Sequence, residues 1–162
     1  MKKYTIRAVD PPKLQNPYGV WFGFLTAMVA VFFAILHLFR VDTLAPIVNT
    51  YLPGDIVAAN LVTVSIIIVE IFSVPFALRM KLSPLAHVVS GLFVVIAPLS
   101  WLLLTIWCFG LDVSTGQFGQ FAYITSSWVP IVMNSLWLVF CFVTLWVLGY
   151  SKYKLPERRK NS

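Results

Sequence analysis

Four long apolar stretches constrain this chain more than any other feature of its sequence. They run over residues 18–39, 56–78, 85–109 and 127–150. A helix rises about 1.5 Å per residue, so about 20 residues cross the hydrocarbon core of a bilayer. None of the stretches contains Lys or Arg, and Glu70 is their only acidic residue. We therefore predict an all-α, polytopic integral membrane protein folded as an antiparallel four-helix transmembrane bundle.

The composition excludes a water-soluble protein. Hydrophobic residues make up 59% of the chain and charged residues only 11%, whereas soluble domains carry about 25% charged residues. A soluble fold of this kind would expose large apolar patches and aggregate. The net charge of +6 does not indicate nucleic-acid binding, because the basic residues flank the apolar stretches and do not gather on one solvated face. We therefore expect the lipid bilayer, and not a nucleic acid, as the partner of this chain.

The basic residues predict which way the chain is threaded. Of the 12 Lys and Arg residues, 11 lie in residues 1–17, 79–84 and 151–162, and Arg40 is the twelfth. Loops rich in Lys and Arg stay in the cytoplasm. We expect a cytoplasmic N-terminal segment (residues 1–17), a transmembrane domain (residues 18–150) and a basic cytoplasmic tail (residues 151–162). The expected location is a bacterial cytoplasmic (inner) membrane.

Small and kink-forming residues mark the helix faces that turn toward other helices. Membrane helices pack through small side chains that let their backbones approach. Residues of this kind recur at helical spacing, and the set expected to pack between helices is Gly19, Gly23, Ala27, Ser73 and Pro98.

Glu70 is the first candidate for a functional site. A charged carboxylate inside a membrane is costly, so such a residue faces the bundle interior, stays protonated or finds a partner. It lies about 13 Å from the cytoplasmic edge by helical rise. At the same depth, counted in residues along the helix, the other three spans carry no basic side chain. We expect Glu70 to be neutral and hydrogen-bonded, as a structural contact, a proton or ligand site, or a contact to a partner subunit.

Asn134, His37 and His87 are the other candidates for a proton or ligand site. Asn134 lies on the polar stripe of the fourth span. The two histidines lie near opposite ends of their spans, so they cannot ligate one haem iron and are expected at the membrane interfaces. Cys108 and Cys141 differ in depth by too much for a disulfide. No metal site, no catalytic residue and no specific cofactor is predicted.

Two segments between the spans have features of their own. Residues 41–53 are too short to cross a bilayer and too apolar for a plain loop, and their pattern predicts a short amphipathic helix in the outer interface. Residues 110–122 contain Gly, Gln and Phe. This outer loop is expected to be either a mobile cap or a docking surface.

Several local features resemble the DoxX-like family of small membrane proteins. They are the polar end of the first span (His37-Leu38-Phe39-Arg40), the external segment ending at Leu52-Pro53-Gly54, and the acid in the second span (Val69-Glu70-Ile71). The resemblance covers about residues 18–150. It implies four spans and a role beside quinone-linked or thiol-linked redox systems, or as the membrane partner of a soluble enzyme.

The sequence leaves three functional hypotheses. The first is an accessory or structural subunit of a larger membrane complex, because the spans hold no set of nucleophile, base and orienting group. The second is a small quinone-linked or redox-linked membrane protein in which Glu70 handles a proton. The third is an oligomeric proton-coupled carrier or channel. Other membrane subunits are expected partners, and bound lipid, quinone or pigment is compatible with all three.

Overall fold

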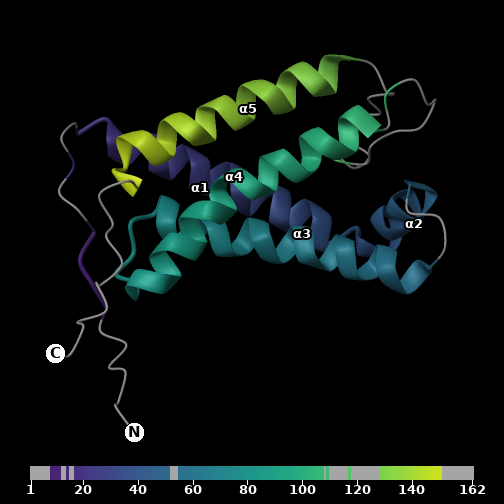
Figure 1. The fold of residues 1–162 in the computed structure, drawn as a ribbon, viewed down its shortest axis with the longest axis horizontal. Helices are drawn as coiled ribbons and strands as arrows, with labels where there is room; N and C mark the ends of the chain where they lie inside the picture. Colours follow the sequence, from purple (N-terminus) through teal and green to yellow (C-terminus); the bar gives the residue numbers. More distant parts are fainter. Residues whose placement is uncertain are drawn as a thin grey trace, which may run out of the picture.

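Five helices make up most of the described chain. The computed structural model describes residues 8–11, 14, 17–51, 55–107, 109, 117 and 128–150. The helices are α1 (Gly19–Leu38), α2 (Val41–Tyr51), α3 (Ile56–Ala77), α4 (Pro84–Trp107) and α5 (Trp128–Val147) (Figure 1). Four of them, α1, α3, α4 and α5, are long and apolar enough to cross a membrane. Their bounds lie within three residues of the predicted spans, and the described residues contain no strand.

Local features of the chain set where α3 begins and ends and where α4 begins. Asp55 caps α3, with its Oδ1 accepting from the Val57 N–H at 2.9 Å. At α4, the Ser83 hydroxyl oxygen accepts from the Ala86 N–H at 3.2 Å, and Pro84, which has no N–H to satisfy, takes the first helical position. Beyond the end of α3, Arg79 has a φ of 56°. That left-handed residue stops the helix.

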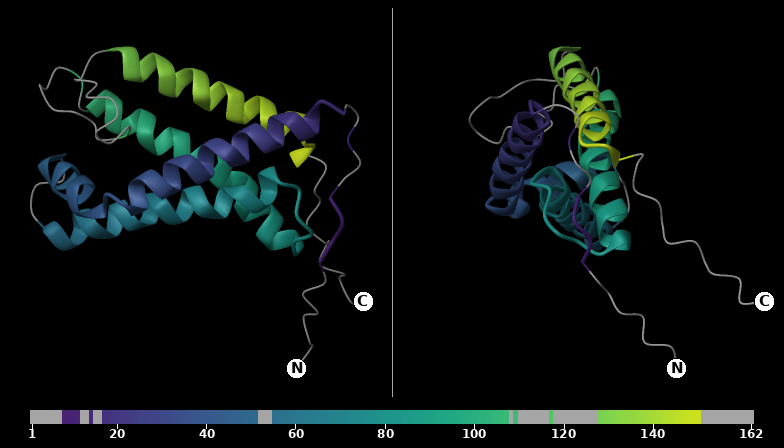
Figure 2. Two further views of the ribbon diagram at one scale, coloured as in Figure 1. Left: turned by 180° about the vertical axis from the view of Figure 1, so that it is seen from behind. Right: turned by 90° about the vertical axis from the view of Figure 1, so that its left-hand side faces the viewer.

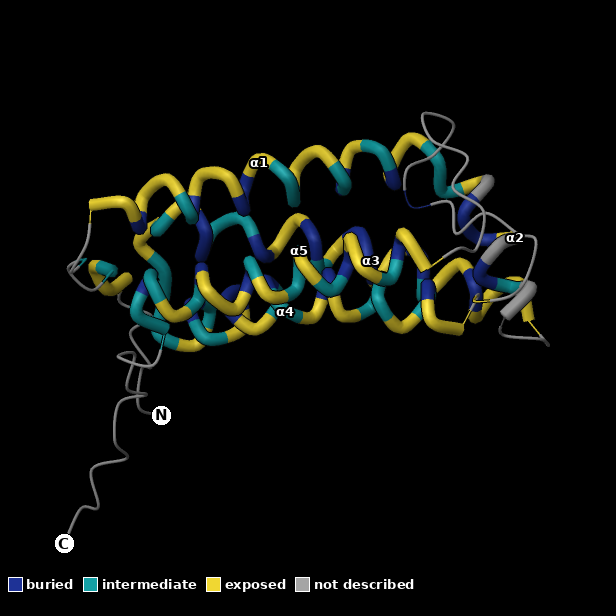
Figure 3. The backbone as a smooth tube through the Cα atoms, turned by 90° about the horizontal axis from the view of Figure 1, so that it is seen from above, coloured by how far each residue is buried: buried dark blue, intermediate teal, exposed yellow. Residues whose placement is uncertain are grey.

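The central element of the fold is α3, which packs against α1, α2 and α4, while α5 packs mainly on α4. Seen from behind, α1 crosses in front of α4 on its way from the end of α5 to α2 (Figure 2). Exposed residues lie on the outward sides of the helices and buried residues on their inward sides (Figure 3). The outward residues are largely apolar.

Gly23 lets α1 and α3 approach each other closely. A Cβ atom at this position would lie 2.3 Å from the backbone oxygen of Ala77, so only glycine fits. Gly23 is near the beginning of α1 and Ala77 is the last residue of α3, and the two helices run in opposite directions (Figure 2). All five residues expected to pack between helices, Gly19, Gly23, Ala27, Ser73 and Pro98, are buried.

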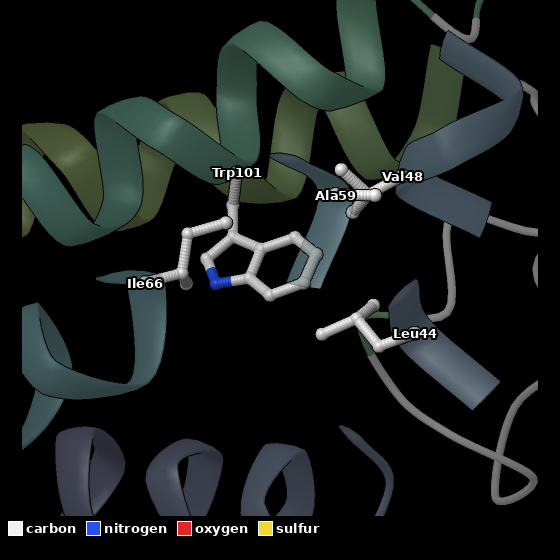
Figure 4. Packing of buried hydrophobic residues seen from close by; sticks show 5 residues of the cluster. All are labelled: Leu44, Val48, Ala59, Ile66 and Trp101. Carbon is white, nitrogen blue, oxygen red and sulfur yellow. The ribbon is translucent and has the colours of Figure 1, made fainter. Parts of the chain in front are cut away.

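The short helix α2 closes one end of the molecule. Its apolar side chains Leu44 and Val48 are buried against Ala59 and Ile66 of α3 and Trp101 of α4 (Figure 4). The short helix predicted for residues 41–53 is therefore present over Val41–Tyr51. In the last turn of α1, His37 is buried, whereas Ile35 and Leu38 are exposed.

At the opposite end, the N-terminal segment contacts the connection between α3 and α4. The Val9 N–H donates to the Leu82 backbone oxygen at 2.9 Å, and Lys81 Nζ lies 2.7 Å from Asp10 Oδ1. The hydrogen bond and the negative charge of Asp10 raise the pKa of Lys81 above its usual value. These contacts place the two segments at one end of the molecule.

Candidate functional site

The buried carboxyl group of Glu70 lies where three helices meet. Glu70 projects from α3 and is 2% exposed. Its Oε2 lies 2.9 Å from His37 Nδ1 of α1, and its Oε1 accepts from the indole N–H of Trp101 of α4 at 2.9 Å. Both carboxyl oxygens therefore have a protein partner. We refer to His37 and Glu70 below as the acid–base pair.

The His37 ring stacks against two aromatic rings and has a partner at each nitrogen. It is 2% exposed. Its plane stacks against Phe33 at 5.7 Å between ring centroids and against Trp101 at 4.5 Å. Its Nε2 lies 3.2 Å from the backbone oxygen of Gln117, which comes from the connection between α4 and α5. The ring thus has a fixed position and orientation.

One prediction about this region is wrong, because Glu70 does have a base beside it, His37. That His37 lies at the depth of a membrane interface stays a prediction. From the Gly23–Ala77 contact, His37 lies 14 residues onward and Glu70 only 7 residues back. Their Cα atoms therefore differ in depth by about 10 Å. Side chains lean toward the N-terminus of their own helix. In helices that run in opposite directions, these two long side chains lean toward each other and close that gap.

Asn134 joins the acid–base pair through Gln117. The side-chain amides of these two residues bond reciprocally: Gln117 Nε2 donates to Asn134 Oδ1 at 2.7 Å, and Asn134 Nδ2 donates to Gln117 Oε1 at 2.9 Å. Asn134 Nδ2 also donates to the Thr105 hydroxyl at 3.0 Å, and that hydroxyl donates to the Trp101 backbone oxygen. The network runs from Glu70 through His37, Gln117, Asn134 and Thr105 back to Trp101.

The hydrogen-bond partners fix how many protons the acid–base pair holds. A backbone carbonyl can only accept, so His37 Nε2 must carry a hydrogen to bond Gln117. Between Nδ1 and Oε2 there is then one proton. It belongs either to a neutral Glu70 that donates to bare Nδ1, or to an imidazolium that donates to the Glu70 carboxylate. The net charge of the pair is zero in both states.

A small cavity lies beside Glu70. Its volume is about 20 Å³, which is room for about one water molecule. Its walls include Glu70, Ser73, Trp101 and Cys141. Thr26 also lines it, and the Thr26 hydroxyl lies 3.0 Å from that of Thr144. The cavity therefore gives the carboxyl group a neighbouring space whose walls are mostly apolar, with a few polar side chains among them.

An apolar groove lies between α1 and α5 on the outside of the molecule. Its volume is about 380 Å³. Its walls are mainly apolar side chains of the two helices, together with the side-chain amides of Gln117 and Asn134. The lining residues are Leu25, Val29, Phe33, Gln117, Met133, Asn134, Leu136, Trp137 and Phe140. Phe33, Gln117 and Trp137 also line the cavity beside Glu70. One layer of side chains therefore separates groove and cavity.

The structure brings three of the four candidate residues together. Glu70, His37 and Asn134 belong to one network, whereas His87 lies near the start of α4. The His87 ring packs 4.9 Å from the ring of Phe76, in a cluster that includes Tyr150. His87 is therefore not part of the acid–base site.

The sequence did not single out Trp101, Thr105 and Gln117 as site residues. Trp101 and Thr105 lie four residues apart on one face of α4, which is a detectable helical pattern. Gln117 lies outside the helices, where no periodicity marks it. Among the described residues, no group of three or more His, Cys, Asp or Glu side chains is placed to hold a metal ion. Cys108, whose depth was predicted, lies outside the described residues.

The fold and the site define a class: a helical protein with four membrane-length helices around a buried acid–base pair. No protein-family model matches the chain, no curated protein matches it, and no solved structure matches it.

Proposed function

We propose that the chain is an integral membrane protein of the bacterial inner membrane, crossed by α1, α3, α4 and α5 as an antiparallel bundle. The length and apolar surface of the four helices support this. The Val9–Leu82 contact supports a shared side for the N-terminal segment and the connection between α3 and α4. The excess of Lys and Arg on that side favours the cytoplasm.

We infer that the protein binds and releases a proton at the acid–base pair in response to a small lipid-soluble molecule. The observation that carries this is the 2.9 Å contact between His37 Nδ1 and Glu70 Oε2, with Nε2 held by a carbonyl. One proton is shared there at net charge zero. Buried charge pairs add little stability over apolar packing, and ionisable residues inside a membrane mark functional sites. The resemblance to the DoxX-like family, which implies a role beside redox systems, stays part of this proposal.

Infrared spectroscopy of the protein in lipid nanodiscs tests this function. As the pH is changed, the carbonyl stretch of a protonated carboxylic acid should appear or shift with the state of the acid–base pair. Glu70→Gln should remove that signal. Asp55→Asn is the matched control, because it also removes one carboxylate but keeps an oxygen to cap α3. A spectrum unchanged by Glu70→Gln would contradict the proposal.

An accessory subunit is the second candidate, and α5 favours it. This helix is the least buried of the four long ones and exposes Trp128, Leu136 and Trp146. A photo-cross-linking residue at Leu136 should then join one partner that also co-purifies at fixed stoichiometry. The matched control is Leu61 of α3, which is similarly exposed. Purification as a homogeneous protein with lipid alone would contradict this candidate.

A further inference from the structure

The charge balance of the acid–base pair limits what can remove its proton. With one shared proton the pair is neutral, and without it the pair carries one negative charge in a low-dielectric interior, which is strongly unfavourable. The proton therefore leaves readily only when another positive charge takes its place. None of the four predicted spans contains Lys or Arg. A bound cation can supply the compensating charge.

Few titratable groups surround the pair. From α1 comes His37 itself, and from α5 comes Cys141, which lines the cavity. The neighbouring residues of α4 are Trp101 and Thr105, and Gln117 adds an amide. The helix α2, which packs on α3, carries Asp42 in its first turn, and Arg40 lies just before that helix. Glu70 is thus the one carboxyl group among the residues that line the cavity.

The groove between α1 and α5 suits an apolar cation. Its volume of about 380 Å³ is within the usual range of small-molecule sites, about 300–1,000 Å³. Three aromatic side chains line it, Phe33, Trp137 and Phe140, and Trp137 stacks on Phe140 at 5.3 Å. Aromatic faces attract cations. Since the other walls are mostly apolar, the cation must itself be lipophilic.

Charge balance at Glu70 favours a cation over a neutral carbonyl compound. Glu70 does not line the groove itself, and Phe33, Gln117 and Trp137 lie between the groove and the cavity beside Glu70. A cation in the groove therefore acts on the carboxylate across one layer of side chains, where a low dielectric keeps the Coulomb interaction strong. A neutral quinone-type molecule brings no charge to balance the carboxylate.

We propose that the groove binds a lipophilic organic cation in exchange for the proton shared by His37 and Glu70. The proposal rests on the proposed function. When the cation binds, the shared proton passes to water. His37 remains neutral with its hydrogen on Nε2, Glu70 becomes a carboxylate, and the cation balances its charge. No covalent bond between heavy atoms forms or breaks, and the net charge of the site stays zero.

Calorimetry with tetraphenylphosphonium tests the exchange. Protein in nanodiscs is titrated in two buffers of different ionisation enthalpy, which gives the number of protons released. We expect one cation bound and one proton released. The affinity should fall about tenfold per unit decrease in pH while the pair holds its proton, as linkage requires. Triphenylphosphine oxide, of similar shape but neutral, should neither compete nor release a proton. Competition by a neutral quinone would overturn the choice of a cation.

Two variants and one control locate the site. Glu70→Gln keeps a partner for both His37 and Trp101 but cannot lose a proton, so it should abolish binding of tetraphenylphosphonium. Trp137→Leu should weaken binding about tenfold through loss of the aromatic face. Trp146→Leu, on the same helix but 80% exposed and outside the groove, should leave affinity unchanged. Equal effects at Trp137 and Trp146 would overturn the assignment of the groove.

The outcomes separate this inference from the proposed function. If tetraphenylphosphonium fails to bind, or binds without proton release, while the infrared signal of Glu70 is present, the exchange proposal is wrong and the proton site stands. If the infrared signal is also absent, both are wrong.

Discussion

Replacing Glu70 by Gln and by Leu should have very different effects on stability. Glutamine reproduces the neutral form of glutamate: its amide N–H donates to bare His37 Nδ1, and its oxygen accepts from the Trp101 indole. Leucine fills a similar volume but offers neither group. It leaves a buried donor on Trp101 and a buried acceptor on His37.

The size of the difference follows from the two hydrogen bonds. A stranded buried polar group costs about 1–3 kcal/mol in soluble proteins, and hydrogen bonds between membrane helices average about 0.6 kcal/mol, with a maximum of about 1.7. Two such bonds give an expected loss of about 2 kcal/mol in the free energy of unfolding for Glu70→Leu. For Glu70→Gln we expect a loss below about 0.6 kcal/mol, that is, less than one such bond.

Reversible unfolding in mixed micelles with increasing dodecyl sulfate, followed by tryptophan fluorescence, measures both values. Equal losses for the two variants would refute the reasoning, because the carboxyl group would then make no specific bonds. Glu70→Leu could instead raise the free energy of unfolding while Glu70→Gln leaves it close to that of the unsubstituted protein. That result would refute only the estimated cost of the stranded groups.

Three further changes test other contacts of the structure. Gly23→Ala should lower the free energy of unfolding by about 1–3 kcal/mol, because its Cβ would meet the Ala77 backbone oxygen at 2.3 Å. Gly19→Ala should lower it less, because its Cβ would meet only side chains, at 3.0 Å or more. A larger loss for Gly19→Ala than for Gly23→Ala would contradict this packing. Trp101→Phe should cost about 1 kcal/mol in unfolding and shift the infrared carbonyl signal of Glu70, whereas an unshifted signal would argue against the indole bond. A double-mutant cycle of Gln117→Ala and Asn134→Ala should give a coupling of about 1 kcal/mol for the reciprocal amides, and strict additivity would contradict it.

The helices were predictable from sequence because the thickness of a bilayer and the turn signals at Asp55 and Ser83 set their lengths and starts. Glu70, His37 and Asn134 could be singled out because polar side chains are rare in such spans. Their pairing could not be read from depth, since counting Cα positions ignores the lean of each side chain. Gln117 was missed because loop residues carry no periodic signal.

The protonation of the His37 ring tests the central claim most directly. Nitrogen-15 NMR of labelled protein in bilayers, with His87→Gln to leave one histidine, reports which ring nitrogen carries a hydrogen. The account predicts a hydrogen on Nε2 and a proton shared between Nδ1 and Glu70, with the Nδ1 signal changed by Glu70→Gln. A neutral ring with bare Nε2 and its hydrogen on Nδ1 would contradict it.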